Sequence, residues 1–204
     1  MDGAARRRHA AREGGMPLSK DHKARTRERI IAAAARLFRR DGVDGVSVPG
    51  LMKEAGLTQG GFYAHFASKD ALVAEAVARG LRDTTERMVG VAERSGDPIG
   101  AMIDDYLSPG HRDQPEAGCI VSALGAEASR GAPVIREAMT DGIREAARRL
   151  KEKLGLEGDG EDEAIALFAG MIGALVLARA TRTDPAFSDR VLKVSAERLK
   201  RSFK

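Results

Sequence analysis

Apolar residues recur along this chain at the spacing of one face of a helix. Over residues 23–40 they occupy relative positions 0, 4, 7 and 8, at Ile30, Ala34, Leu37 and Phe38. This spacing predicts an amphipathic helix. Gly42 is expected to end it, because Gly readily adopts the left-handed conformation that often follows a helix.

Two shorter helices are predicted next. Ser47 suits an N-cap, and Gly56 is expected to end the helix that follows it. Thr58 suits the N-cap of a third helix that runs to Phe66, and Ser68 then begins a fourth. Three helices with a Gly-containing turn between the second and third are typical of a helix-turn-helix bundle.

The pattern stays helical beyond residue 82. Helices are predicted to begin at Asp97-Pro98 and Asp184-Pro185, where an N-cap residue precedes a Pro at the first helical position. Between them we expect a loop at 109–118, a helix around 119–129, a long helix after Gly131, a loop at 155–163 and an apolar helix at 164–180. Neither strands nor internal repeats are evident, so the predicted fold class is all-α.

The predicted architecture has two domains. A three-helix helix-turn-helix domain at 20–69 is joined to a larger helical domain at 70–204. Residues 1–19 have no helical period and are expected to form a disordered basic arm. Its arginines suit either a minor-groove contact or a solvated tail: Arg6, Arg7, Arg8 and Arg12.

Positive charge is concentrated in the N-terminal third. The net charge is +4, but residues 1–69 carry 14 Lys and Arg against 7 Asp and Glu, whereas residues 70–204 carry 20 against 23. This asymmetry favours a polyanionic partner such as DNA, although basic termini also aid solubility.

The composition is that of a cytoplasmic protein. A single Cys excludes an internal disulfide framework and fits a reducing compartment. No apolar segment follows the N-terminal charges, so no secretory signal is expected. The most apolar run, 164–178, is shorter than the roughly 20 residues that span a bilayer, and no membrane partner is predicted.

Side chains suited to reading DNA bases stand at the start of the third predicted helix. A recognition helix enters the major groove with its first turn leading. There Gln59 can pair with adenine, and Thr58 can contact a base edge. Gly60 and Gly61, each about 1 kcal/mol worse than Ala in a helix, suit a backbone that approaches DNA closely. The candidate DNA contacts are Arg25, Thr26, Ser47, Thr58, Gln59, Gly60, Gly61, Tyr63, His65 and Lys69.

The phosphate backbone has candidate ligands on both sides of this helix. Tyr63 and His65 offer donors, and Lys69 adds charge to a helix N-terminus that already favours phosphate. Arg25 and Thr26 can hold the phosphate on the other side. No single residue of this set indicates DNA binding, since Tyr63, for example, equally suits a core aromatic. Only their arrangement around one helix indicates a DNA contact.

Residues 23–70 contain four motifs in order: RIIAAAARLFRRDG, V-x-x-L-M-K-E-A-G-L-T, GGFYAHF and SKDALV. With these motifs the segment resembles the N-terminal domain of the TetR family of bacterial transcriptional regulators. The resemblance implies a DNA-binding domain at 20–69 and an effector-binding and dimerisation domain at 70–204. The resemblance implies that the third helix reads the major groove and that Thr58, Gln59, Gly61, Tyr63, His65 and Lys69 contact DNA. Pro49-Gly50 departs from the family pattern, although Pro is accepted in the first turn of a helix.

The resemblance also implies a homodimer formed by the last two helices. The segment AIALFAGMIGALVLA is apolar nearly all round, so it must be covered on every side. The candidate interface residues are Leu167, Gly170, Gly173, Leu175, Leu192 and Leu199. Two-fold symmetry would pair with a palindromic operator in double-stranded DNA.

An unidentified small-molecule effector is expected among the preceding helices. Methionine adapts to varied ligands, and the candidate pocket residues are Met102, Tyr106, Cys119, Met139, Phe168 and Met171. Each also suits ordinary core. Cys119 could serve as a redox sensor, but the sequence favours a small buried hydrophobe at this position.

Other functions find little support. A ferritin-like metal enzyme needs Glu-x-x-His pairs, and none of His9, His22, His65 and His111 has Glu three residues before it. No nucleotide-binding or hydrolase motif appears in context. We therefore predict no enzyme activity, no metal site and no cofactor. A repressor released by an effector is the favoured function, and a helical protein-binding or structural bundle is the alternative.

Overall fold

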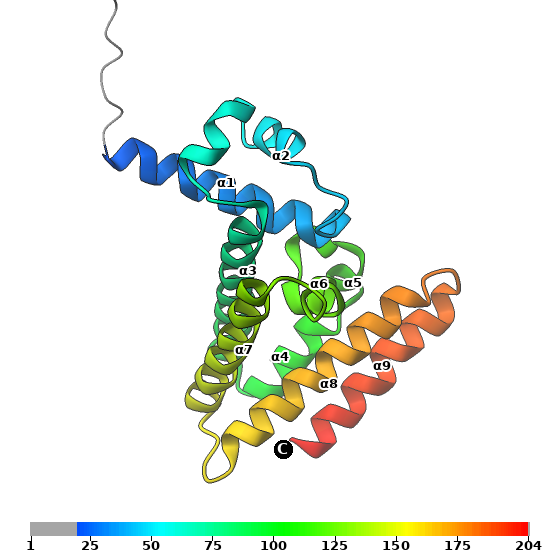
Figure 1. Ribbon diagram of the computed structural model, residues 1–204. Coiled ribbons are helices and arrows are strands. Elements are labelled where there is room, and N and C mark those ends of the chain that lie inside the picture. Colours follow the sequence, from blue (N-terminus) through cyan, green and yellow to red (C-terminus); the bar gives the residue numbers. More distant parts are fainter. Residues whose placement is uncertain (1–19, 204) are drawn as a thin grey trace, which may run out of the picture.

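The computed structural model describes residues 20–203, so the predicted arm at 1–19 lies outside the described part. Over this range the chain is all-helical, as predicted (Figure 1). Its elements are α1 (Lys20–Asp41), α2 (Val48–Glu54), the 3-10 helix η1 (Gln59–Ala64), α3 (Lys69–Ala92), α4 (Pro98–Tyr106), α5 (Pro109–Asp113), the 3-10 helix η2 (Pro115–Ala117), α6 (Ile120–Ala128), α7 (Pro133–Leu154), α8 (Gly160–Ala180) and α9 (Pro185–Ser202).

The elements form two ends joined by a long helix. α1, α2 and η1 lie together at one end, and α3 leads away from them alongside α7 (Figure 1). α8 and α9 form an antiparallel pair on the other side of the molecule. The predicted domain boundary at 69/70 falls in the first turn of α3.

The predicted N-caps form hydrogen bonds. The Ser47 side chain accepts from the Gly50 amide at 3.2 Å, and Ser68 accepts from Ala71 at 3.0 Å. The carboxylates of Asp97 and Asp184 do the same for the helices that begin with Pro98 and Pro185. Each cap satisfies a backbone donor that the first helical turn leaves free. The predicted starts of α2, α3, α4 and α9 are therefore confirmed.

The third helix differs from its prediction. Residues 59–64 form a six-residue 3-10 helix instead of an α-helix that runs to Phe66, and the Thr58 side chain makes no capping hydrogen bond. Gly60 and Gly61 give the physical reason, because two adjacent poor helix formers weaken a segment of this length. The tighter 3-10 geometry is common in such short pieces.

Residues 109–118 form two short helices where a loop was expected. Ser108 caps α5 by accepting from the His111 amide at 3.2 Å, and Pro109 occupies the first turn. η2 follows after a single residue. α8 also begins at Gly160, four residues before its predicted start.

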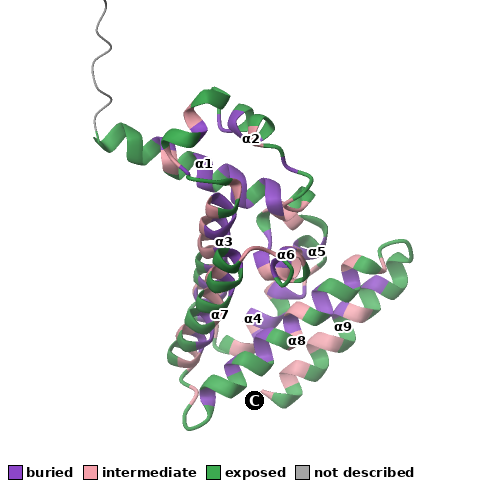
Figure 2. Cartoon of the chain, viewed as in Figure 1, coloured by how far each residue is buried: buried purple, intermediate pink, exposed green. Residues whose placement is uncertain are grey.

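One hydrophobic core runs through both ends of the molecule. It includes Phe38 and Phe62 at the helix-turn-helix end, Leu72 and Val77 on α3, and Leu167 on α8. Buried positions follow the inward sides of the helices (Figure 2). The helix-turn-helix end is therefore packed on the rest of the chain, through α3.

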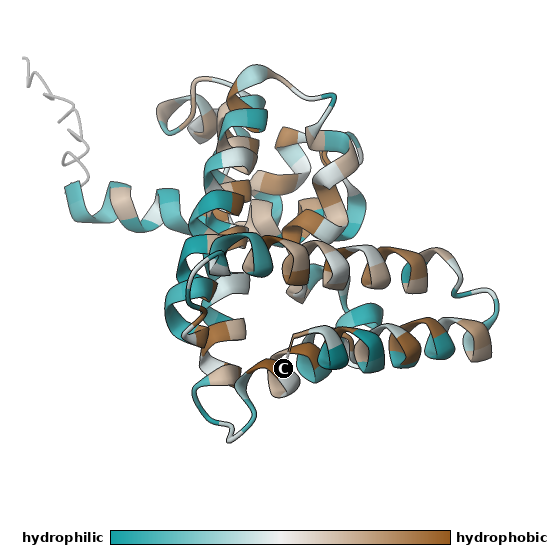
Figure 3. Ribbon diagram, turned by 90° about the horizontal axis from the view of Figure 1, so that it is seen from below, coloured by the Kyte–Doolittle hydropathy of each residue, from teal (hydrophilic) through white to brown (hydrophobic). Residues whose placement is uncertain are grey.

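α8 is a core helix. Among residues 20–203 it alone has the length and apolar composition that would cross a membrane. It packs against α5, α6, α7 and α9, and its buried side chains include Leu167, Met171 and Leu175. Figure 3 shows α8 and α9 side by side, with apolar positions along both helices.

Candidate DNA-binding interface

The start of η1 is an exposed tip. Thr58, Gln59 and Gly60 are exposed, and a Cβ added to Gly60 would meet no atom within 4 Å. Tyr63 is 75% exposed. A large aromatic residue that is this exposed leaves its hydroxyl free for a partner, so the structure favours the contact reading of Tyr63 over the core reading.

Aromatic side chains hold the tip in place. Phe62 is fully buried and makes an edge-to-face contact with Tyr63, with ring centroids 5.1 Å apart. Phe66 is buried beside it, and the Arg27 guanidinium lies 4.7 Å from its ring centroid. Arg27 also forms an ion pair with Glu75 on α3. The exposed face of η1 is thus fixed from behind by the core and by α1 and α3.

His65 stands beside this tip in a basic environment. Its Nδ1 is buried without a hydrogen-bond partner among the described residues. Burial lowers the pKa of the imidazole, and the positive charges of Lys23 and Arg27 lower it further. Lys23 was not singled out from the sequence, because its helical position alone does not show that it faces His65.

Lys69 links two segments of the helix-turn-helix end. Its Nζ donates a 2.7 Å hydrogen bond to the carbonyl oxygen of Val43, in the connection between α1 and α2. The Lys69 side chain is half-buried. Since an ammonium carries three donors, this bond leaves capacity for a phosphate oxygen.

The remaining candidates differ in exposure. Arg25 is exposed and pairs at 2.8 Å with Asp21, one turn away. Thr26 is 8% exposed, and its hydroxyl lies 3.4 Å from Nδ1 of His22. Ser47 is exposed, but its hydroxyl is engaged in the α2 cap. Arg25 is therefore free to exchange its surface partner for phosphate, whereas Thr26 and Ser47 have structural bonds.

Two arginines of α1 support this end from within. Arg29 donates a 2.7 Å hydrogen bond to the Ala55 carbonyl at the end of α2, and Arg36 pairs with Glu54 at 2.7 Å. Both bonds join α1 to α2 and fix the angle between them.

Comparisons with known proteins decide the family. Residues 30–76 match the family model described as "Bacterial regulatory proteins, tetR family". The HTH-type transcriptional regulator LmrA of Bacillus subtilis (strain 168) is 31% identical over 143 residues, which cover 68% of this chain and 76% of LmrA. The chain belongs to the TetR family.

Other TetR-family similarities agree with this assignment. An HTH-type transcriptional repressor of Mycobacterium tuberculosis (strain ATCC 25618 / H37Rv) is 40% identical over 96 residues, 47% of this chain and 49% of the repressor. The crystal structure of reduced NemR from E. coli superposes with a TM-score of 0.73 at 25% identity, covering 87% of this chain and 96% of NemR.

Membership of the TetR family settles the class of function. The protein is a DNA-binding transcriptional regulator and belongs to a non-enzymatic family. This finding sets aside the alternative of a helical bundle without DNA binding. The residues that contact DNA stay a prediction from this sequence and structure.

The candidate effector residues form packed core. Met102, Tyr106, Cys119 and Met171 are fully buried, and Phe168 and Met139 nearly so. Five cavities in the described part of the chain are lined by other residues than these six. Within residues 20–203 the buried Tyr106 hydroxyl forms no hydrogen bond of ordinary geometry, and its polar neighbour is the weakly hydrogen-bonding Cys119 thiol. Burial raises the pKa of Tyr106 well above the usual value, and Cys119 acts in the same direction.

Most candidate dimer residues stabilise the protomer instead. Leu167, Leu175 and Leu192 are buried within the chain. Gly170 faces Leu199 of α9, and a Cβ added to it would lie 2.8 Å from Leu199 Cδ2. Leu167, Leu175 and Leu192 are enclosed by their own protomer, whereas Leu199 is only half-buried, and the dimer interface stays a prediction.

Gly173 is exposed on α8 and meets nothing within 4 Å. Around it, α8 and α9 carry exposed apolar side chains at spacings that keep them on one side of each helix. We call this set the α8–α9 stripe: Ile165, Val176, Leu177, Phe187 and Val194.

Proposed function

We propose that the protein is a homodimeric repressor that leaves a palindromic operator when a small molecule binds. The observation that carries the proposal is the exposed tip formed by Thr58, Gln59 and Gly60 on a segment anchored by buried Phe62. A surface that recognises DNA bases needs exposed side chains on a rigid support. Each flexible group that becomes ordered on binding loses conformational entropy, which weakens the affinity.

The division of labour within the tip follows from its chemistry. Gln59 carries both a donor and an acceptor and suits base recognition, whereas Tyr63 carries a hydroxyl that suits phosphate oxygens. Arg25 and Lys69 supply positive charge near the same end. Base contacts give sequence preference, and phosphate contacts strengthen binding to every sequence.

Dimerisation is supported by the α8–α9 stripe. Leu177 is 59% exposed and Phe187 is 50% exposed, on adjacent packed helices. Exposed apolar side chains on two packed helices favour a protein interface over open solvent. Two copies joined along these helices would present two reading heads, as a palindromic operator requires.

Effector release is supported by the buried, unpartnered hydroxyl of Tyr106. A polar group left unsatisfied in a core costs about 1–3 kcal/mol, and a ligand that supplies its partner would recover that energy. Met102 and Met171 are buried in the same core. Because methionine repacks easily, this part of the core can open for an apolar or amphipathic effector at modest cost.

Selection from a random duplex pool tests the function. The expected result is an enriched palindrome whose half-sites lie about one helical turn apart, bound by a dimer. Gln59→Ala should reduce discrimination between the selected and scrambled duplexes, whereas Tyr63→Phe should weaken both alike. A pool without symmetric enrichment would contradict the homodimer, and equal effects of the two variants on both duplexes would contradict the division of labour.

A further inference from the structure

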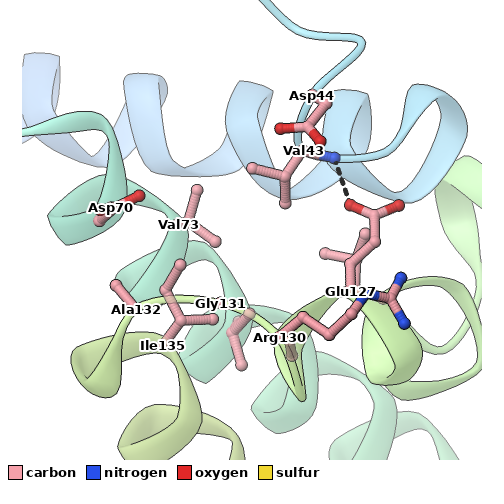
Figure 4. A pocket seen from close by; sticks show the side chains of 12 residues that line it. Val43, Asp44, Asp70, Val73, Glu127, Arg130, Gly131, Ala132 and Ile135 are labelled. Carbon is pink, nitrogen blue, oxygen red and sulfur yellow. Dashed lines mark hydrogen bonds between the residues drawn. The ribbon is translucent and has the colours of Figure 1, made fainter.

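A cavity of about 210 Å³ lies where the helix-turn-helix end meets the rest of the chain (Figure 4). Its walls come from four segments: the α1–α2 connection, the start of α3, α6, and the turn that leads into α7. None of the candidate effector residues contributes to it. A molecule bound here would touch both ends of the protein at once.

The cavity combines an apolar floor with a charged rim. Val73, Val77 and Leu124 are buried beneath it. The rim carries the carboxylates of Asp44, Asp70 and Glu127, and Arg130 is the single basic residue among the described lining residues. Asp44 and Asp70 form no ion pair with any residue in 20–203. The rim is therefore net negative and has unpaired acceptors.

Glu127 joins α6 to the α1–α2 connection. Its Oε2 accepts a 2.8 Å hydrogen bond from the Val43 amide, 84 residues away in sequence. Gly42, with a φ of 74°, lies directly against the carboxylate, and a Cβ there would stand 2.7 Å from Oε1. The contact therefore needs an oxygen acceptor on α6, and the positive φ at the end of α1 favours a glycine there.

The same peptide segment is also held by Lys69. The Val43 amide donates to Glu127, while the Val43 carbonyl accepts from Lys69 Nζ at 2.7 Å. One residue thus connects the rim of the cavity to a candidate phosphate ligand. Any group that competes for the Glu127 carboxylate acts one residue away from the interface with DNA.

We propose that this junction cavity binds a small monocyclic organic cation, whose charged group pairs with Glu127 and releases the Val43 amide. The volume of the cavity favours a ligand with a single ring. A cavity of about 150 Å³ already holds benzene, whereas larger ligands occupy pockets of about 300 Å³ or more. The charge of the lining favours a positively charged ligand, because it contains three carboxylates and one guanidinium. An amidinium also matches a carboxylate with two parallel donors.

Pairing with the cation alters the connection between the two ends. When Glu127 turns to the ligand, the Val43 amide loses its hydrogen bond to α6, while the Val43 carbonyl keeps its bond to Lys69. The α1–α2 connection then moves more freely against α6. Linkage requires that DNA and the cation weaken each other's binding by the same factor. This consequence rests on the proposed function, whereas the binding step does not.

Three isosteric probes test the binding step on the full chain: benzamidine, the neutral benzamide and the anionic benzoate. Titration calorimetry and the amide shift of Val43 in 15N-labelled protein report binding in the absence of DNA. We expect benzamidine to bind and to move the Val43 resonance, with benzamide and benzoate at least about tenfold weaker. Equal binding of the three probes, or a Val43 resonance that benzamidine leaves in place, would overturn the proposal.

Matched variants separate the charge from the fold. Glu127→Gln keeps an oxygen acceptor for the Val43 amide but removes the charge, so benzamidine binding should fall about tenfold while thermal stability is kept. Asp44→Asn on the exposed rim should act in the same direction, and Glu137→Gln on the exposed face of α7 should have no effect. Unchanged affinity in both rim variants would exclude this cavity as the site.

Operator binding separates this proposal from the proposed function. With a selected operator, saturating benzamidine should weaken the wild-type complex and leave the Glu127→Gln complex much less affected. If the operator is bound and benzamidine fails to bind, the junction site is refuted and the repressor stands. If benzamidine binds as predicted but no palindrome is enriched, the repressor is refuted and the site stands.

Discussion

The amide of Cys119 donates a 2.9 Å hydrogen bond to Nε2 of His111, whose Nδ1 lies 2.7 Å from the carbonyl oxygen of Tyr106. A nitrogen that accepts from an amide carries no proton, and a nitrogen beside a carbonyl oxygen must carry one. These two contacts define His111 as the neutral Nδ1-protonated tautomer. The ring is 5% exposed and stands edge-on to Tyr106.

The state of His111 predicts a loss of stability in mild acid. Burial lowers its pKa to about 4, and Arg87 and Arg179 act in the same direction, against the Tyr106 carbonyl, which raises it. In the unfolded chain the pKa is about 6.5. As pH falls from about 6.5 to 4, His111 binds a proton in the unfolded state but stays neutral in the folded state. The free energy of unfolding should therefore fall by up to about 3 kcal/mol over this window.

Urea denaturation from pH 7.5 to 4.5 measures this dependence. His111→Gln should lower stability at pH 7.5, because Gln fits the two hydrogen bonds less well, but should flatten the slope between pH 6.5 and 4.5. An undiminished slope in His111→Gln would assign the acid sensitivity to other groups.

Cys119 should react slowly in the native protein. Its side chain is fully buried, and it is the one Cys of the sequence, so a thiol reagent reports this site alone. We expect the reaction with Ellman's reagent to be at least about a hundredfold slower in native buffer than in denaturant, because it requires local opening. A Ser129→Cys variant adds an exposed thiol for comparison. A wild-type thiol that reacts as fast as that second one would restore the redox-sensor reading.

Gly60→Ala should separate DNA binding from folding. A Cβ at this position meets nothing within 4 Å in the free protein, and its φ is not positive, so thermal stability should stay the same or rise slightly. If the backbone of Gly60 approaches DNA, operator affinity should nevertheless fall, by about tenfold or more. Gly96→Ala, an equally open glycine outside this end, is the matched control. Wild-type affinity in Gly60→Ala would remove the close approach from the proposal.

Leu177→Asp should weaken the dimer. The side chain is 59% exposed on α8, so the protomer tolerates the charge, whereas a second α8–α9 stripe would have to bury it. Sedimentation should show a shift to monomer, and operator affinity should fall with it. Val134→Asp is the control, since Val134 is 43% exposed at the start of α7. A Leu177→Asp protein that stays dimeric would move the interface elsewhere.

Local signals in the sequence located most of the helices. Ser47, Ser68, Asp97 and Asp184 mark helix starts because their short side chains bond amides only three residues away. Gly42 has the left-handed backbone expected of it. Such contacts are encoded within a single turn, so reading a few residues is enough.

Contacts between segments that are distant in the sequence could not be predicted from local patterns. Glu127 and Val43 meet only because α6 folds back on the end of α1, and nothing in the letters around Glu127 marks that bond. α8 shows the same limit differently. Because it is apolar on every side, its sequence did not distinguish Leu175, which is buried, from the neighbouring Leu177, which is exposed.

The short length of η1 limits the number of base pairs that one subunit can contact. Six residues at a rise of about 2 Å each extend roughly 12 Å, which is comparable to three or four base-pair steps of about 3.4 Å. A base sequence of that length recurs by chance throughout any bacterial chromosome. In the proposed dimer, selectivity for one promoter would therefore come from the spacing and orientation of two such short sequences. The geometry of the dimer would then carry information that the side chains of the tip alone do not.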